Sequence, residues 1–204
     1  MSDPWLSFPL LGVEKPLRVG ARIDAQDWAA LAEDEPGELV DGYLEEEEVP
    51  DALHELAVTW LIHTLRTWLG KGGVVLGSDL KLQIGPRTGR KPDVVLYLPG
   101  SPLPRRRGPI TTPPDLVAEV VSPSPRDERR DRVEKMGEYA SFGVKYYWLI
   151  DPALGSFELF ELVDGRYARS AAATSGMLAS VPGCEGLQLD LDALWSELAQ
   201  LPEE

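Results

Sequence analysis

Two short runs decide the fold: KPDVVLY at residues 91–97 and DLVAEVVS at residues 115–122. Both are rich in β-branched residues and lie close to Pro or Gly, which predicts two buried strands. Each run carries one central carboxylate, Asp93 in the first and Glu119 in the second. Burying an ionised carboxylate is costly unless a cation lies beside it. The two acids therefore predict a metal site or an acid–base pair, although each one alone is equally consistent with a structural acid, such as a turn cap at Asp93.

The residues around these acids match a known pattern. Pro92-Asp93, Glu119-Val120-Val121 and Lys135 together resemble the PD-(D/E)XK nuclease superfamily. More narrowly, the chain resembles the Uma-type restriction endonuclease family from about residue 22 to about residue 195. This narrower resemblance is carried by PDLVAEVVSPSP at 114–125, followed by Lys135, Tyr139, Gly143-Val144 and YWLIDP at 147–152.

The resemblance implies a fold and a chemistry. The fold is restriction-endonuclease-like, of the α/β (α+β) class, with a central mixed β-sheet flanked by helices. The chemistry is metal-dependent hydrolysis of DNA phosphodiester bonds, with Mg²⁺, or alternatively Mn²⁺, as the only cofactor. Mg²⁺ suits oxygen ligands and keeps several of its waters. The implied metal ligands are Asp93, Glu119, Glu38 and the backbone carbonyl of Val120, and the implied catalytic set adds Lys135 and Tyr139 to the three acids.

The chain departs from the superfamily pattern at one position. The third residue of the Glu-X-Lys triplet is Val121, so the usual lysine is missing beside Glu119. In the resembled family a lysine stands on the next helix, where this chain has Lys135. We expect Lys135 to replace the missing lysine, and Tyr139, four residues later, to project from the same helical face. The alternative is an ordinary solvent-exposed helix lysine.

Glu38 begins a predicted hairpin at 38–44, whose turn is Asp41-Gly42. In the resembled family a Glu in this place joins the metal site, and without the resemblance Glu38 reads as an exposed strand-end acid. The run Glu45–Glu48 follows and reads as a solvated strand edge. His54 and His63 are nine residues apart on a predicted helix, so they cannot form a helical metal pair; only His54 matches a histidine position of the family.

Apolar periodicity and capping residues predict the remaining elements. Helices are expected at 23–31 with Asp24 as N-cap, at 51–69 with Asp51 as N-cap, and at 126–142 between a serine cap and Gly143. Strands are expected at 74–76, 80–84 and 144–150, and a hairpin at 157–171 around Asp164-Gly165. Residues 86–89 are expected to form a turn, residues 99–114 a surface loop, and the C-terminus a short helix.

Length and composition limit the remaining choices. The 204 residues fit an N-terminal arm at 1–21 and one domain at 22–204. Cys184 is the only cysteine, which excludes an internal disulfide and a multi-cysteine zinc site. No run is long and apolar enough to span a membrane, and the first residues do not resemble a secretory signal. We therefore expect a cytoplasmic protein, and a homodimer because cutting a duplex requires two active sites.

Charge is distributed unevenly along the chain. The net charge is −14, yet residues 81–135 hold 12 Lys/Arg against 7 Asp/Glu. The only basic segment thus contains the candidate site, and its arginines at 105–107 and 126–132 either hold phosphates or are solvated surface charges. Two other functions stay open: a DNA- or protein-binding module of nuclease fold with little or no catalysis, and a partner protein that uses Glu45–Glu48 against a basic protein.

Overall fold

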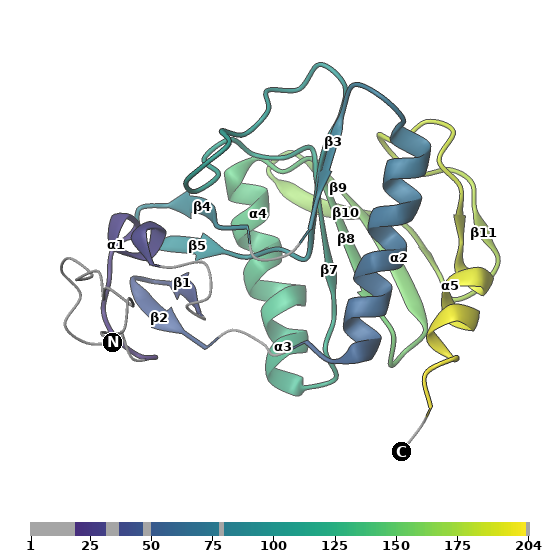
Figure 1. Cartoon of the computed structure of the whole chain (residues 1–204), viewed down its shortest axis with the longest axis horizontal. Coiled ribbons are helices and arrows are strands. Elements are labelled where there is room, and N and C mark those ends of the chain that lie inside the picture. The colour runs from purple at the N-terminus through teal and green to yellow at the C-terminus, as the bar shows by residue number, and fades with distance from the viewer. Residues whose placement is uncertain (1–18, 32–36, 47–49, 78–79, 203–204) are drawn as a thin grey trace, which may run out of the picture.

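A computed structural model describes residues 19–31, 37–46, 50–77 and 80–202 (Figure 1). Most of the predicted N-terminal arm, Glu47 and Glu48 lie outside these residues. The centre of the fold is a six-stranded sheet in the order β10-β9-β8-β7-β6-β3, in which β7 and β8 run parallel and all other neighbours run antiparallel. The predicted central mixed sheet is therefore confirmed. Its strands are β3 (Val74–Leu76), β6 (Val94–Tyr97), β7 (Leu116–Val120), β8 (Tyr146–Asp151), β9 (Ser156–Val163) and β10 (Arg166–Ala173).

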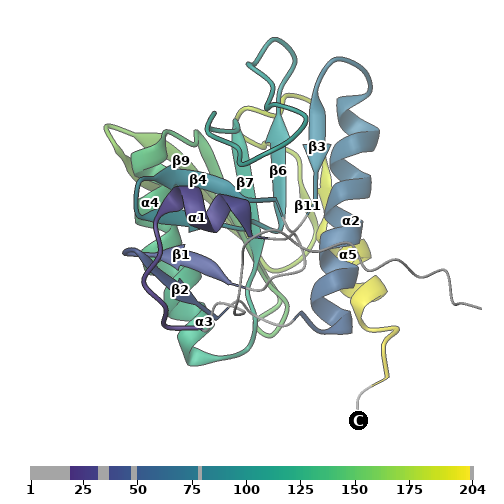
Figure 2. The ribbon, with the colours of Figure 1, turned by 60° about the vertical axis from the view of Figure 1, so that its left-hand side comes forward.

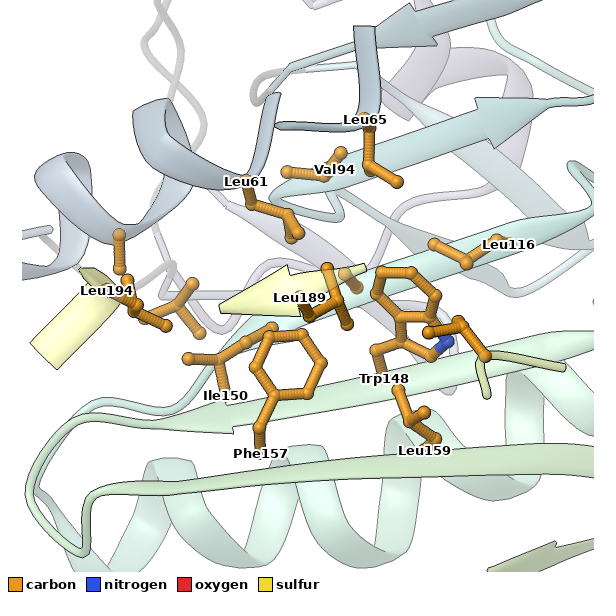
Figure 3. Packing of buried hydrophobic residues seen from close by; sticks show 14 of the residues in the cluster. Leu61, Leu65, Val94, Leu116, Trp148, Ile150, Phe157, Leu159, Leu189 and Leu194 are labelled. Atoms are coloured by element: carbon orange, nitrogen blue, oxygen red, sulfur yellow. The ribbon is translucent and has the colours of Figure 1, made fainter. Parts of the chain in front are cut away.

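Helices cover both faces of this sheet because the central strands are apolar on both sides. Along β7, Leu116, Ala118 and Val120 pack into the cluster that contains α2 (Ala52–Leu69) and α5 (Leu191–Leu198). Val117 and Val121 pack on the opposite face, with Tyr139 of α4 (Met136–Phe142). Figure 3 shows the first cluster, in which Leu61 and Leu65 of α2 lie above Trp148, Phe157 and Leu159. Glu119 alternates with the residues that face α2, so its side chain lies on the α4 face.

A second, four-stranded sheet lies beside the first, in the order β2-β1-β5-β4 (Figure 2). Its strands are β1 (Glu38–Val40), β2 (Tyr43–Glu45), β4 (Leu82–Gly85) and β5 (Thr88–Arg90), and α1 (Ala25–Ala30) packs on it. The predicted turn at 86–89 is wrong in part, since Thr88 already belongs to β5. Gly89 leaves room for Trp28 of α1: a Cβ at Gly89 would lie 2.3 Å from that ring.

Local capping and turn chemistry agree with the sequence. The Asp24 carboxylate accepts hydrogen bonds from the backbone amides of Gln26 and Asp27, and the Asp51 carboxylate accepts one from the His54 amide. In both hairpins the Asp-Gly pair has positive φ at both residues, as a type I′ turn requires: Asp41-Gly42 and Asp164-Gly165. The caps and turns predicted at these four places are confirmed.

The helix predicted at 126–142 is three segments rather than one. It begins with α3 (Pro125–Arg129), capped by Ser124, continues as a π-helical segment η1 (Arg130–Lys135), and ends as α4 before Gly143. A π-helical turn contains one extra residue and rotates the side chains that follow it. Such insertions are frequent at functional sites, and this one ends on Lys135.

Short elements complete the fold. β11 (Met177–Leu178) and β12 (Leu189–Asp190) pair with each other, and α5 forms the predicted C-terminal helix. The loop between β6 and β7 is not wholly on the surface as predicted, because Ile110 is buried and bridges to Leu82 of β4. None of the helices in the described part of the chain is both long and apolar enough to cross a membrane.

Candidate active site

Asp93 lies directly before β6 and is held from two other elements. Its Oδ2 accepts a hydrogen bond from the Val120 amide at 2.7 Å and lies 3.2 Å from His54 Nε2 of α2. The Asp93 side chain is 15% exposed, and both of these contacts reach its Oδ2 rather than its Oδ1. One carboxylate oxygen is therefore fixed while the other is left for a ligand.

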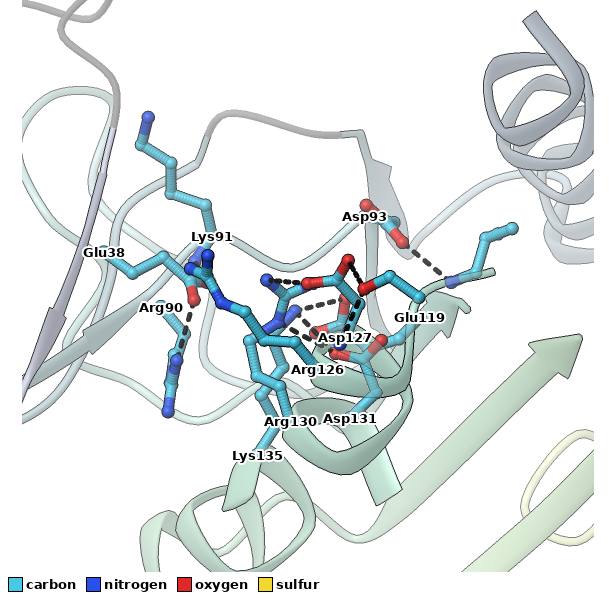
Figure 4. A network of polar contacts seen from close by, with 12 residues as sticks. Glu38, Arg90, Lys91, Asp93, Glu119, Arg126, Asp127, Arg130, Asp131 and Lys135 are labelled. Atoms are coloured by element: carbon cyan, nitrogen blue, oxygen red, sulfur yellow. Dashed lines mark hydrogen bonds and ion pairs between the residues drawn. The ribbon is translucent and has the colours of Figure 1, made fainter. Parts of the chain in front are cut away.

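Glu119 lies on β7 with its carboxylate directed at the helix that follows the strand. Its Oε2 accepts a hydrogen bond from Lys135 Nζ at 3.0 Å, and its Oε1 accepts one from the Tyr139 hydroxyl at 2.6 Å. Figure 4 shows Lys135 rising from the helix towards Glu119, with Asp93 near the other side of the Glu119 carboxylate. Lys135 thus reaches Glu119 from the helix in place of a lysine at position 121.

Asp131 is a further buried acid beside the same lysine. Its Oδ1 lies 3.1 Å from Lys135 Nζ, and also 3.4 Å from Arg130 Nε. Tyr147, a neighbour on β8, donates its hydroxyl to the Asp131 carbonyl at 2.9 Å. Both Asp131 and Lys135 belong to the π-helical segment, and both side chains are buried.

The electrostatics of this cluster are unbalanced. Burial raises the pKa of Glu119 to about 8; the Lys135 ammonium opposes this rise, whereas the negative charges of Asp93 and Asp131 add to it. Burial lowers the pKa of Lys135, but the carboxylates of Glu119 and Asp131 outweigh burial and hold that pKa above its usual value. Lys135 faces Glu119 and Asp131, Asp93 lies beside Glu119, and the second cation of the cluster, Arg130, pairs with Asp131. Glu119 is therefore the acid at which the cluster favours either a proton or an added cation.

Glu38 lies at the start of β1 in a different environment. Its Oε2 accepts a hydrogen bond from Arg90 Nη1 at 2.7 Å, and its Oε1 accepts one from the Lys91 amide at 2.9 Å. Arg90 also pairs with Glu138 of α4. Burial alone would raise the pKa of Glu38, but the charges of Lys135 and Arg90 and the Lys91 amide lower it to about 2.

The oxygen atoms at the ends of β6 and β7 are candidate ligands for a divalent metal ion. Among residues 19–31, 37–46, 50–77 and 80–202, no group of three or more His, Cys, Asp or Glu side chains converges as a ready metal site. Mg²⁺ needs only one or two carboxylates, however, because it keeps several waters. Asp93 offers a free oxygen, and the excess negative charge at Glu119 favours a cation. The Val120 amide points at Asp93, and in an extended strand the carbonyl of the same residue points to the same side. These residues fit a Mg²⁺ ion; Glu38 would have to release Arg90 and Lys91 to join them.

The arginines of the basic segment divide into two groups. Arg105, Arg106 and Arg107 are exposed, as are Arg126 and Arg129. Arg130 is buried in the site cluster, and Arg132 is half-buried and pairs with Asp151 and Glu158. These last two support the π-helical segment and are not the solvated charges that one interpretation of the sequence predicted.

Three site residues were not singled out from the sequence: Asp131, Arg90 and Glu138. The spacing Asp131-x₃-Lys135 was a usable signal, because residues four apart share a helical face. Arg90 gave no local signal, since it precedes Lys91 in an ordinary basic pair. His54 was interpreted mainly as a surface or packing residue, with a place near the site as the alternative that its match to a family histidine suggested, and the structure places it against Asp93.

Comparisons with known proteins agree with this fold. A crystal structure from Anabaena variabilis ATCC 29413, described as "a putative nuclease belonging to DUF820", superimposes with a TM-score of 0.69. The two chains are 17% identical, and the match covers 86% of this chain and 99% of the other, which shows a shared fold. None of the curated proteins searched matches this chain. The family model Uma2, described as "Putative restriction endonuclease", matches residues 24–192, and the protein therefore belongs to the Uma2 family.

Proposed function

We propose that this protein is a metal-dependent endonuclease that hydrolyses phosphodiester bonds in DNA. One observation carries the proposal: Asp93, Glu119 and Lys135 meet at the adjacent ends of β6 and β7. Membership of the Uma2 family supports the nuclease class.

Asp93 Oδ1, the Glu119 carboxylate and the Val120 carbonyl would hold Mg²⁺. When bound, Mg²⁺ lowers the pKa of an attacking water and neutralises charge that develops on the phosphate. His54 and the Val120 amide fix Asp93 by its other oxygen. A fixed carboxylate binds an ion with less loss of conformational freedom, which is the usual role of such supporting contacts.

Lys135 serves as a cationic hydrogen-bond donor in this proposal. Its pKa is raised by its carboxylate neighbours, so it keeps its proton at neutral pH. A protonated lysine cannot accept a proton from water, but it can donate to a phosphate oxygen and stabilise the charge of the transition state. Tyr139 orients Glu119 through the 2.6 Å hydrogen bond. Glu38 has an electrostatic role on Arg90 and Lys135 in this proposal, and its role as metal ligand stays a prediction.

The test is nicking of a supercoiled plasmid with Mg²⁺ or Mn²⁺ and with EDTA as a control. Wild type should cut only with a divalent ion, and Asp93→Asn and Glu119→Gln should lower the rate by more than about 1,000-fold, since each removes several kcal/mol of charge stabilisation. Glu185→Gln, at an exposed glutamate, is the matched control and should cut like wild type. Undiminished nicking by Glu119→Gln would contradict the proposal, and preferential cleavage of an RNA oligonucleotide would correct its substrate.

A second function has one observation in its favour. Both oxygens of Glu119 are engaged by Lys135 and Tyr139, which is the arrangement of an inert ion pair. A binding module of nuclease fold would keep this arrangement permanently. Such a protein would bind DNA or a protein partner and leave plasmid intact with every divalent ion. The predicted homodimer also stays a prediction, to be tested by sedimentation.

A further inference from the structure

A small cavity lies against the candidate active site. Its volume is about 140 Å³, and its wall includes His54 and Val120, the two residues that hold Asp93. The other side of the cavity is formed by the loops that follow β7 and β8, with Pro123 and Pro152 among its lining residues. A group bound in the cavity would therefore lie next to the atoms that hold the proposed metal ion.

The wall of this cavity suits a flat ring with polar edges. Leu53, Pro152 and Ala153 give apolar surface, and the His54 ring and Pro123 add flat faces. Asp51 and Ser122 also line it and supply an acceptor and a hydroxyl group. Pockets for drug-sized ligands measure about 300–1,000 Å³, so this cavity is of a size for one small ring system.

The charges around the site argue against binding through phosphates alone. Arg126 and Arg129, the exposed arginines of α3, are each paired with a glutamate, Glu46 and Glu134 respectively. Residues 105–107 lie on the loop between β6 and β7, at the opposite end of these strands from Asp93 and Glu119. A protein with a net charge of −14 that binds a polyanion needs a further source of affinity, because phosphate contacts normally supply most of it.

We propose that this cavity binds one unstacked nucleobase next to the phosphate that is cut. The inference rests on the proposed nuclease function and specifies its substrate: single-stranded DNA, or duplex DNA with an unpaired nucleotide at the cut. In a continuous duplex every base is stacked and cannot enter the cavity without being flipped out. The base would stack on His54 and the prolines, with its polar edge towards Asp51 and Ser122.

The first experiment uses a short single-stranded DNA oligonucleotide and a series in which one nucleotide at a time is replaced by an abasic site. Cleavage and binding are measured for wild type with Mg²⁺ and without divalent ions. An abasic site at one position beside the cut should weaken binding by about 5- to 100-fold, the range that one stacked base supplies. Abasic sites elsewhere should have little effect. A perfect duplex of the same sequence should be cut more slowly than the single strand.

The second experiment fills the cavity from its exposed rim. Ala153→Trp should weaken binding of the intact oligonucleotide to the level of the abasic one and should abolish the abasic effect, while Mn²⁺ binding is retained. Ala168→Trp is the matched control, because Ala168 is also exposed but lies on β10 at the far edge of the sheet. Leu53→Trp fills the cavity from α2 and replaces Ala153→Trp if that variant does not fold.

The outcomes separate the two proposals. Normal cleavage with no sensitive abasic position, or with duplex preferred, overturns the base cavity and leaves the nuclease standing. No cleavage with any ion, but binding that depends on one base and is lost in Ala153→Trp, overturns the nuclease and supports the cavity. Equal binding by Ala153→Trp, Ala168→Trp and wild type overturns the cavity in either case.

Discussion

Two buried glutamates show how one site contains two kinds of acid. Glu38 in the small sheet is matched by Arg90 and the Lys91 amide, and its pKa is lowered to about 2. Glu119 in the central sheet shares Lys135 with Asp131 and faces Asp93, and its pKa is raised to about 8. The difference shows that Glu38 already has its cation, whereas Glu119 lies where a further cation is favoured. We therefore propose that Glu38 stabilises the fold and that Glu119 is the acid that binds a metal ion.

The largest expected effect on stability comes from removing the shared cation. Lys135→Ala removes the buried ammonium group that pairs with both Glu119 and Asp131, which should cost about 3–5 kcal/mol of unfolding free energy. Urea denaturation at pH 7 measures it. Lys145→Ala is the matched control: Lys145 pairs with Asp115 but is 64% exposed, so its loss should cost about 1 kcal/mol or less. Equal losses in the two variants would contradict the buried-cluster assignment.

Glu38→Gln should give the next largest loss. The folded-state pKa of about 2 lies below the ordinary value of 4.5, so ionised Glu38 contributes stability that is fully present above about pH 4.5. That contribution, about 3 kcal/mol, is lost as the pH falls from 4.5 towards 2. The variant should therefore be less stable than wild type at pH 7 and should approach it in acid. Denaturant titrations across this pH range measure the difference in unfolding free energy between the variant and wild type. A difference that stays constant over the range would contradict the assigned ionisation.

Tyr139→Phe should have a smaller effect. It removes one hydroxyl that donates to the buried Glu119 carboxylate at 2.6 Å, a loss of about 1–2 kcal/mol. Thermal unfolding of Tyr139→Phe beside Tyr43→Phe provides the measurement, because Tyr43 is 45% exposed and should tolerate the change. No difference between the two would mean that the hydroxyl does not support Glu119.

Glu119→Gln should lower the unfolding free energy the least. The pH dependence of its effect should be opposite in sign to that of Glu38→Gln. The folded-state pKa of about 8 lies above 4.5, so the contribution of protonated Glu119 is fully present below about pH 4.5 and is lost as the pH rises towards 8. Glutamine is close in shape to the protonated acid. The variant should be at least as stable as wild type at pH 7, with its advantage growing from pH 4.5 to 8. Marked destabilisation at pH 7 would show that Glu119 is ionised and structural.

Much of the fold was predictable because the sequence signals for its strands and turns are local. The β-branched runs around Asp93 and Glu119 formed strands, and the Asp-Gly pairs formed turns. The family resemblance named the acids and Lys135. Strand β5 was not predicted, because Gly89 was interpreted as a turn residue. In the structure Gly89 instead leaves room for the Trp28 ring.

The site itself was only partly predictable because its charges are balanced by residues distant in sequence. The partnership of Glu38 with Arg90 and Glu138 depends on three separate elements. The π-helical segment has the apolar pattern of an ordinary helix, so the sequence indicates that Asp131 and Lys135 can share a face but not that this face is buried beside Glu119. The sequence therefore identified the acids but did not show which of them is already matched by an arginine.

The most direct test of which glutamate binds the metal ion is calorimetric titration of Mn²⁺ into wild type, Glu38→Gln and Glu119→Gln at pH 7. Wild type should bind the ion, Glu38→Gln should retain most of that affinity despite its lower stability, and Glu119→Gln should lose at least about 100-fold despite its intact stability. Absence of binding in wild type, or loss of binding in Glu38→Gln but not in Glu119→Gln, would contradict the assignment of Glu119 as the ligand.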